Sequence, residues 1–171
     1  RIERFRNHPA LLAWHIIDEP EVAHEPRGEG EKPSDEYMPA AYKMIKERDP
    51  DHPVTAVLCM FAGIPRFAPS LDVVQADYYP IPPIPATNFW GTGFRGIAHM
   101  VDESRKASAN QKPFWFVAQA FNYSVQKSRS FDIPPEWKRF PTLRELRTMT
   151  YTAVASGARG IFFYSTMELM Q

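Results

Sequence analysis

The sequence predicts an α/β protein with a parallel sheet, of the (β/α)8 TIM-barrel type and present here as roughly the second half of the barrel. Short apolar runs alternate with amphipathic helical segments, and no hairpin signal joins two neighbouring runs, a pattern typical of parallel strands with right-handed crossovers. Connections after the helices are short, whereas most connections after the strands are long and rich in proline and aromatic residues. Five predicted strands in 171 residues are too few for a whole barrel, which needs about 200–250 residues.

The predicted strands share a high content of apolar residues and are bounded by Pro, Gly or Asp. In chain order they are Leu11–Ile17, Val54–Met60, Leu71–Tyr79, Phe114–Phe121 and Gly160–Thr166. The first is nearly continuous in apolar residues, so we expect it to be buried on both faces of the sheet. No linker or break in composition divides the chain, which predicts a single domain over residues 1–171.

The predicted helices lie between these strands, at residues 34–48, 94–108 and 142–157, and residues 1–7 resemble the last turn of another. Thr142 is followed at capping-box spacing by Glu145, which marks a helix start;. Helical spacing predicts that apolar side chains face the core, among them Tyr37, Met44 and Leu143;. Residues 21–33 are charged and rich in Pro and Gly, and we expect them to form an exposed loop.

Two adjacent acids, Asp18 and Glu19, follow the first strand and are closed off by Pro20. Pro has no N–H and turns the chain away from the sheet, so the acids fall at the carboxyl end of a parallel strand. Barrel enzymes place their chemistry at this end of the strands. By strand alternation His15 is expected on the same face as Glu19, either as a hydrogen-bonded core histidine or as part of the site.

Composition excludes several classes of function. Twenty basic and twenty acidic residues cancel, so no basic surface indicates nucleic acid or an anionic membrane as a partner, and no apolar run is long enough for a spanning helix;. The five histidines form no metal-ligand spacing, and the only cysteine, Cys59, is expected to be buried;. Neither a dinucleotide fingerprint nor a phosphate-binding loop is present, so the sequence predicts no metal and no cofactor;. The chain starts with Arg1 and is expected to be the interior of a longer product, and its compartment stays unknown;.

One stretch resembles a known family. Residues 8–20 read His-Pro-Ala-Leu-Leu-Ala-Trp-His-Ile-Ile-Asp-Glu-Pro and resemble the fourth strand of the clan A glycoside hydrolases, the (β/α)8 group that contains cellulases and β-galactosidases. In that family the strand leads into Asn-Glu-Pro, and the glutamate is the general acid/base, a role that the resemblance gives to Glu19. Residues 77–80, 112–119 and 157–164 resemble parts of strands six, seven and eight, in matching order.

The resemblance implies strands four to eight of a glycosidase barrel that hydrolyses O-glycosidic bonds in a carbohydrate substrate, such as a polysaccharide. It also implies that the remaining barrel strands lie on the same longer chain or on a partner chain, and it is compatible with a secreted or periplasmic protein. A half barrel alone would leave sheet edges open and is expected to dimerise or aggregate.

The sequence departs from the family at two positions. Asp18 replaces the family's asparagine, and Gln119 stands where the family has its nucleophilic glutamate. Because an amide cannot act as that nucleophile, three interpretations stay open. In the first, another carboxylate works with Glu19, and Asp77 is the better candidate and Glu168 the next. In the second, Asp18 and Glu19 act as in substrate-assisted N-acetylhexosaminidases, where the aspartate orients an acetamido group. In the third, the protein binds a glycan without cleaving it.

The remaining site candidates are expected to contact substrate. Gln119 would line the site, and aromatic rings could stack on sugar faces, although each could equally be core or loop packing. These aromatic candidates are Tyr78, Tyr79, Trp90 and Tyr164.

Overall fold

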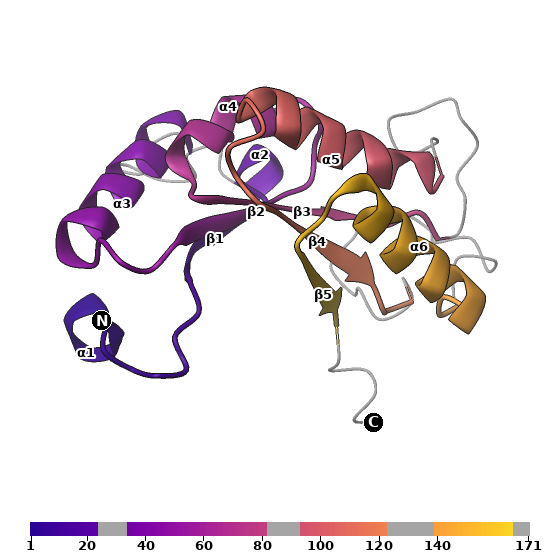
Figure 1. Cartoon of the computed structure of the whole chain (residues 1–171), viewed down its shortest axis with the longest axis horizontal. Helices are drawn as coiled ribbons and strands as arrows, with labels where there is room; N and C mark the ends of the chain where they lie inside the picture. The colour runs from indigo at the N-terminus through magenta and orange to yellow at the C-terminus, as the bar shows by residue number, and fades with distance from the viewer. Residues whose placement is uncertain (24–33, 82–92, 123–138, 166–171) are drawn as a thin grey trace. The chain divides into compact units, whose positions relative to one another are not determined.

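The computed structural model describes residues 1–23, 34–81, 93–122 and 139–165. Within them the five strands form one sheet in the order β1-β2-β3-β4-β5 (Figure 1). The strands are β1 (Trp14–Asp18), β2 (Val54–Leu58), β3 (Val73–Tyr78), β4 (Phe114–Gln119) and β5 (Gly160–Tyr164). The pairings of β1 with β2, β2 with β3 and β4 with β5 are parallel. The predicted α/β fold with a parallel sheet is therefore confirmed.

The helices agree with the prediction in place and differ in detail. They are α1 (Ile2–Phe5), α2 (Pro20–Ala23), α3 (Ser34–Arg48), α4 (Gly63–Phe67), the 3₁₀ turn η1 (Ala68–Ser70), α5 (Arg95–Ala107) and α6 (Leu143–Ser156). The predicted capping box is present at the start of α6, where Thr142 accepts a hydrogen bond from the Glu145 N–H. Gly157 ends α6 with a φ of 113°, a left-handed conformation that suits glycine;. The short helices α2 and α4 lie in segments predicted as loops.

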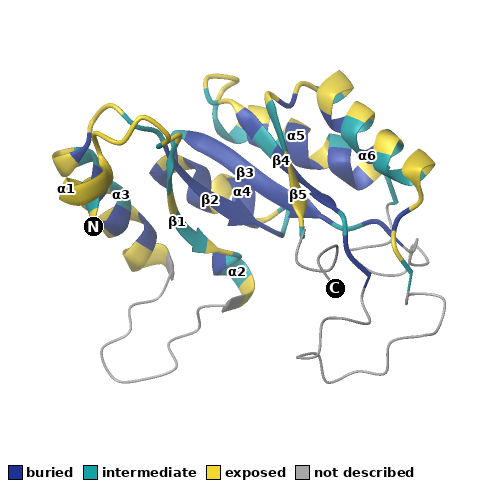
Figure 2. Cartoon of the chain, turned by 90° about the horizontal axis from the view of Figure 1, so that it is seen from below, coloured by how far each residue is buried: buried dark blue, intermediate teal, exposed yellow. Residues whose placement is uncertain are grey.

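By contacts the chain divides into two compact units. The first comprises residues 1–76 and 102–114, and the second comprises residues 77–101 and 115–171. In the first unit β2 is buried along its whole length, whereas β1 is half-buried to exposed (Figure 2). The expectation that the first strand is buried on both faces is therefore wrong, because β1 is an edge strand paired only with β2.

A bulge in β1 determines which side chains share a face in the first unit. His15 pairs with Thr55 but Asp18 pairs with Val57, so three steps on β1 match two steps on β2;. The bulge reverses the alternation, and His15 and Asp18 therefore share a face. The β2 residues Thr55 and Val57 pair with Val73 and Gln75, so the same face continues onto β3, where the Gln75 Oε1 accepts a hydrogen bond from Thr55 at 3.3 Å.

A buried aspartate ties β1 to the end of α3. Trp14 donates its indole N–H to Asp49 at 2.8 Å, and His52 lies 2.8 Å from the same carboxylate. Burial alone would raise the pKa of Asp49, but the hydrogen bonds from Trp14 and His52 lower it to about 2. This cluster fixes the start of β1, because Trp14 is the first residue of the strand.

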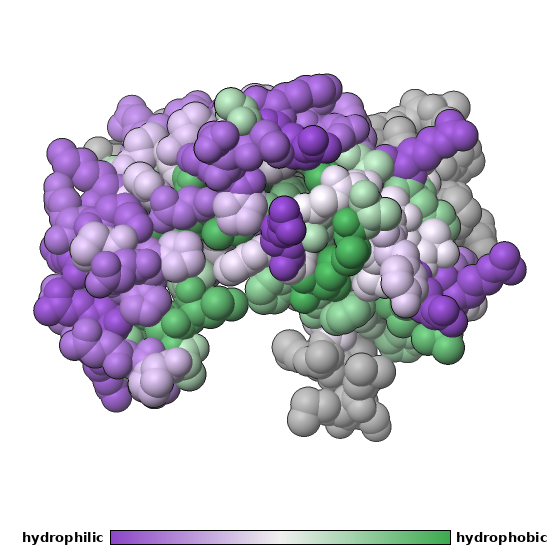
Figure 3. All heavy atoms as spheres, in the orientation of Figure 1, coloured by the Kyte–Doolittle hydropathy of each residue, from purple (hydrophilic) through white to green (hydrophobic). Residues whose placement is uncertain are grey.

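Two of the side chains predicted to face the core in α3, and one in α6, lie at the surface instead. Tyr37 is 41%, Met44 40% and Leu143 72% exposed, whereas Met38 and Met149 on the same two helices are fully buried. Helical spacing therefore predicted these two helices correctly but included too many residues in the face of each helix that is buried. In the second unit, hydrophobic side chains reach the surface around β5 (Figure 3), where Phe162 and Phe163 are 38% and 51% exposed.

Candidate active site

The carboxyl end of β1 carries the two adjacent acids. Asp18 is the last residue of the strand and is exposed, and Glu19 is half-buried. Glu19 has a φ of 47°, a left-handed conformation that non-glycine residues seldom adopt;. Its N–H donates to the Val57 carbonyl at 2.9 Å, and its carbonyl accepts the Val22 N–H at 3.1 Å. Hydrogen bonds on both sides thus hold the backbone of Glu19 in this conformation at the end of the strand.

The bulge places His15 on the same face of the sheet as Asp18. The expectation that His15 shares a face with Glu19 stays a prediction, because Glu19 lies beyond the strand in a left-handed conformation to which alternation does not apply. Its side chain reaches the surface, yet desolvation by the surrounding protein lowers the pKa of His15, and the charge of Asp18 opposes this effect. His15 and Asp18 therefore act on each other electrostatically on one face of the sheet.

Glu21 is a member of this group that the sequence analysis placed in an exposed loop. It lies in α2, and its Oε1 accepts the N–H groups of Cys59 at 3.1 Å and Met60 at 3.2 Å, directly after β2 ends. Burial raises the pKa of Glu21, the backbone hydrogen bonds lower it, and the charge of Glu19 raises it again. The only sequence signal was its position immediately after Asp-Glu-Pro, since the segment has no core pattern.

In the second unit, Asp77, Tyr78 and Tyr79 lie at the carboxyl end of β3 and have different surroundings. Asp77 is only 3% exposed. Tyr78 is fully buried, and its ring packs so closely on Gly96 of α5 that a Cβ there would overlap the ring. This packing agrees with the interpretation of Tyr78 as a core residue, and its contact with a sugar stays a prediction.

Gln119, at the end of β4, is fully buried in the second unit. Its Oε1 accepts the Ile81 N–H at 3.1 Å, and its Nε2 donates to the Ile81 carbonyl at 2.8 Å and to the Phe121 carbonyl at 3.3 Å. The amide therefore connects the segments that follow β3 and β4. The expectation that Gln119 lines the site stays a prediction; in this structure its side chain has no exposed surface and binds backbone.

Three aromatic rings pack together near the ends of β3, β4 and β5. Tyr79 and Tyr164 are stacked, with ring centroids 6.3 Å apart and planes at 24°, and each meets Phe121 edge to face. Tyr164 is 48% exposed and Tyr79 is half-buried, while Phe121 lies beneath them at 1%. The cluster presents tyrosine rings at the surface on a buried phenylalanine, as a sugar-stacking platform would require.

Two of the predicted site residues, Trp90 and Glu168, lie outside the described residues. The carboxylates of the second unit that the structure describes are those of Asp77 and Glu145. Glu145 forms an ion pair with Arg139 at 2.8 Å, and mainly for this reason its pKa is lowered to about 2. Glu145 is therefore committed to the start of α6.

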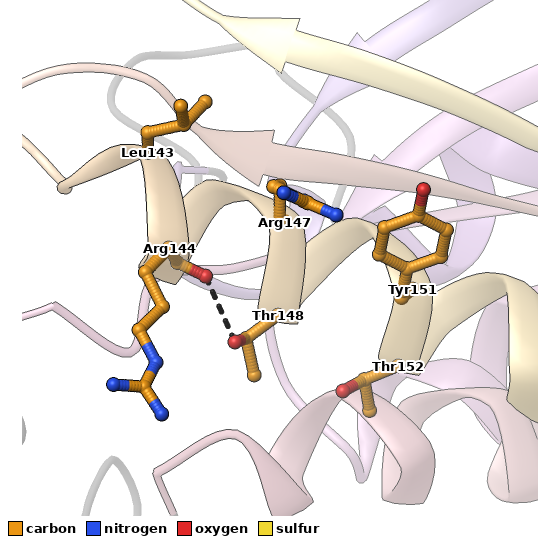
Figure 4. A pocket seen from close by; sticks show the side chains of 6 residues that line it. All are labelled: Leu143, Arg144, Arg147, Thr148, Tyr151 and Thr152. Atoms are coloured by element: carbon orange, nitrogen blue, oxygen red, sulfur yellow. Dashed lines mark hydrogen bonds between the residues drawn. The ribbon is translucent and has the colours of Figure 1, made fainter.

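A shallow groove on α6 is separate from these residues. It is lined by one face of the helix, with Leu143, Arg147 and Tyr151 along it (Figure 4). It contains no predicted site residue. No cluster of three or more potential metal ligands occurs among the described residues, and none of the helices described is long and apolar enough to cross a membrane.

The parallel sheet with helices between its strands is that of a segment of a (β/α)8 barrel, the fold class that the sequence predicted. The same fold is found in solved structures of several enzymes. A β-glucuronidase from Ruminococcus gnavus matches with a TM-score of 0.62 and 17% identity over 96% of this chain. A β-glucuronidase from an uncultured Clostridium sp. gives 0.62 and 15% over 95%, and one from Dictyoglomus thermophilum gives 0.58 and 17% over 94%.

The chain spans about a quarter of the length of these enzymes, 27%, 27% and 26% respectively. At this identity the match establishes the fold. No family model matches the chain, and no curated protein matches it.

Proposed function

We propose that the protein hydrolyses O-glycosidic bonds in a carbohydrate substrate, with Glu19 as the general acid/base. The observation that carries the proposal is that Glu19 is half-buried at the carboxyl end of a parallel strand, where its N–H donates one hydrogen bond and its carbonyl accepts another. The acidic group of a glycosidase must reach the glycosidic oxygen from a fixed position, and barrel enzymes hold such groups at this end of the sheet.

Asp18 and Asp77 are the candidates for the second function in catalysis. Gln119 is excluded as nucleophile, both because it is an amide and because it is buried;. In a two-carboxylate mechanism Asp77 would act as nucleophile or as the base that activates water. In a substrate-assisted mechanism Asp18 would orient an acetamido group of the substrate, and Glu19 would protonate the leaving oxygen.

The aromatic cluster and the sheet edges suggest the partners. Tyr79 and Tyr164 expose ring surface near the carboxyl ends of β3 and β5, where they would stack on a pyranose ring. β1 and β5 are the two edges of the sheet, and the remaining strands of a barrel would pair with them, from the same longer chain or from a partner chain;.

The test compares kcat/KM of Glu19→Gln and of the parent protein, both full length, on aryl glycosides with poor and with good leaving groups. Loss of a general acid is expected to lower kcat/KM by about 10²–10⁴ on aryl glycosides with poor leaving groups. With dinitrophenyl glycosides the loss should be much smaller, because this leaving group departs without a proton. Glu47→Gln, an exposed glutamate on α3, is the matched control. Equal activity of Glu19→Gln and the parent protein on poor leaving groups would remove Glu19 from this role.

A glycan-binding protein without hydrolytic activity is the second candidate, and it is favoured by the amide of Gln119 at the position where the family has its nucleophile. It predicts calorimetric binding of an oligosaccharide with no turnover on any aryl glycoside. An aryl β-glucuronide, an aryl β-galactoside and an aryl N-acetylhexosaminide form the first substrate panel. Turnover confined to the N-acetylhexosaminide would indicate the substrate-assisted mechanism.

A further inference from the structure

A second glutamate, Glu21, lies two residues beyond Glu19 and is bound to a different strand. Its Oε1 accepts two consecutive backbone N–H groups, those of Cys59 and Met60, at the point where the chain leaves β2. The side chain of Glu21, which is half-buried, packs so closely on Gly63 that a Cβ added there would overlap its Oε1. The two backbone hydrogen bonds and this packing hold the Glu21 carboxylate against the end of β2.

The backbone of Glu19 is held at the same place. Its N–H reaches the Val57 carbonyl on β2, and the left-handed φ of 47° then directs the chain into α2, where Glu21 lies. The segment from Glu19 to Glu21 is thus attached to the end of β2 at both ends, by the main chain of Glu19 and by the side chain of Glu21. Without the second attachment, only the bond to Val57 and the turn closed by Val22 would hold Glu19 in its unfavourable conformation.

We propose that Glu21 is a positioning residue, which sets the direction of the Glu19 side chain by binding the backbone at Cys59 and Met60. This inference rests on the proposed role of Glu19 as the general acid. The carboxylate of Glu21 packs on Gly63 and binds backbone N–H groups, so we infer that it acts through Glu19 and not by contact with the substrate. Its raised pKa agrees with this partly buried position near Glu19.

Three substitutions test the proposal in the full-length protein. Glu21→Gln retains an oxygen that can accept both N–H groups, and should keep nearly all of the activity. Glu21→Ala removes the attachment, and Gly63→Ala expels the side chain that makes it. Both should lower kcat by about tenfold or more with little change in KM, because a small displacement of the acid is costly. The loss should be largest for poor leaving groups, as for Glu19→Gln.

The double variant Glu21→Ala/Gly63→Ala provides the internal check. If the two residues act through one contact, it should be no worse than Glu21→Ala alone. Additive losses, or an unchanged kcat in Glu21→Ala, would overturn the proposal. Glu47→Ala, an exposed glutamate on α3, is the control for removal of a carboxylate.

Amide hydrogen exchange separates this inference from the proposed function. In Glu21→Ala the N–H of Glu19, bonded to Val57, should exchange faster, while the N–H of Val74, bonded to Pro113 elsewhere in the same unit, should keep its rate. An unchanged exchange rate at Glu19 would refute the positioning role even if the protein proved to be no hydrolase. An inactive parent protein with faster exchange at Glu19 in Glu21→Ala would refute the hydrolase alone.

Discussion

Gln119→Glu restores at the end of β4 the residue type that the resembling family uses as nucleophile, and the structure predicts that it will damage the fold and add no activity. In the parent protein the Nε2 of Gln119 donates to the carbonyls of Ile81 and Phe121. A carboxylate has no proton to donate to them, and would place its charge against two carbonyl oxygens at a position with no exposed surface;. The introduced glutamate must therefore stay protonated in the folded protein.

The cost follows from the pKa of glutamate. In the unfolded chain that pKa is about 4.3, so holding the group neutral at pH 7 costs about 1.36 kcal/mol for each of 2.7 pH units, or about 4 kcal/mol. A protonated carboxyl can donate to only one of the two carbonyls, which adds about 1–3 kcal/mol. Because the pKa is raised in the folded state, the first cost is absent below about pH 4.3 and grows as the pH rises.

Urea unfolding of the full-length protein, followed by circular dichroism between pH 4.5 and 7.5, measures this dependence. Gln119→Glu should lose about 5–7 kcal/mol at pH 7 and recover about 3 kcal/mol of this near pH 4.5, because only the cost of neutralising the carboxyl depends on pH. Gln119→Ala is the control, since it also leaves carbonyls without a donor but introduces no titrating group. A variant as stable as the parent at pH 7 would refute the argument, and a gain in hydrolysis would place residue 119 in the site.

Two further predictions concern the second unit. Thr142→Ala removes the N-cap of α6, which is the hydrogen-bond acceptor of the Glu145 N–H, and should lower the free energy of unfolding by about 1 kcal/mol;. Thr142→Ser should be close to neutral, and equal stability of all three proteins in urea would contradict the capping role. Tyr164→Ala removes an exposed ring stacked on Tyr79 and should weaken glycan binding in calorimetry, while Tyr164→Phe keeps the ring face and most of the affinity; loss of affinity in both variants would indicate a role for the hydroxyl instead of the ring;.

The sequence was sufficient for the fold because each element has a local cause. Short apolar runs produced all five strands, and the Thr142–Glu145 pair located the start of α6. Burial was harder to predict, since it depends on what lies next to each element. β1 has the composition of a central strand, but in this chain it is an edge.

The position of Glu19 in the candidate site could be predicted from the sequence, whereas the residues around it could not. An apolar run followed by two acids and a proline places Glu19 at the carboxyl end of a strand. The bulge that moves His15 to the face of Asp18 has no sequence signal, because one extra residue in a strand leaves the apolar run intact. Glu21 was missed for a related reason: its partners are backbone N–H groups 38 and 39 residues away, which no local pattern reveals.

Tyr78 and Gln119 were interpreted as substrate contacts from the family and from residue type, and the full burial of both side chains could not be predicted in this way. Strand alternation decides which side chains at a strand end face the helices, and Tyr78 lies on the face that packs against α5 at Gly96. At the end of β4 the backbone of two long connections must be satisfied, and the amide of Gln119 has the donors and the acceptor for this purpose;. Polar residue types at strand ends therefore predict a site only where the neighbouring backbone is already paired.

The backbone at Asp18 and Glu19 bears on the choice between the two hydrolytic mechanisms. In a regular strand adjacent side chains point to opposite faces, so two consecutive acids could not act on the same sugar. Glu19 follows the last residue of β1 and has a left-handed φ of 47°, so regular strand alternation does not apply between it and Asp18. A substrate-assisted mechanism is compatible with this backbone, whereas the two-carboxylate mechanism requires a second carboxylate besides Glu19, and the first candidate, Asp77, is 3% exposed. Hydrolysis of an N-acetylhexosaminide and of its analogue without the acetamido group is therefore the comparison that separates the mechanisms, since only substrate assistance requires that group.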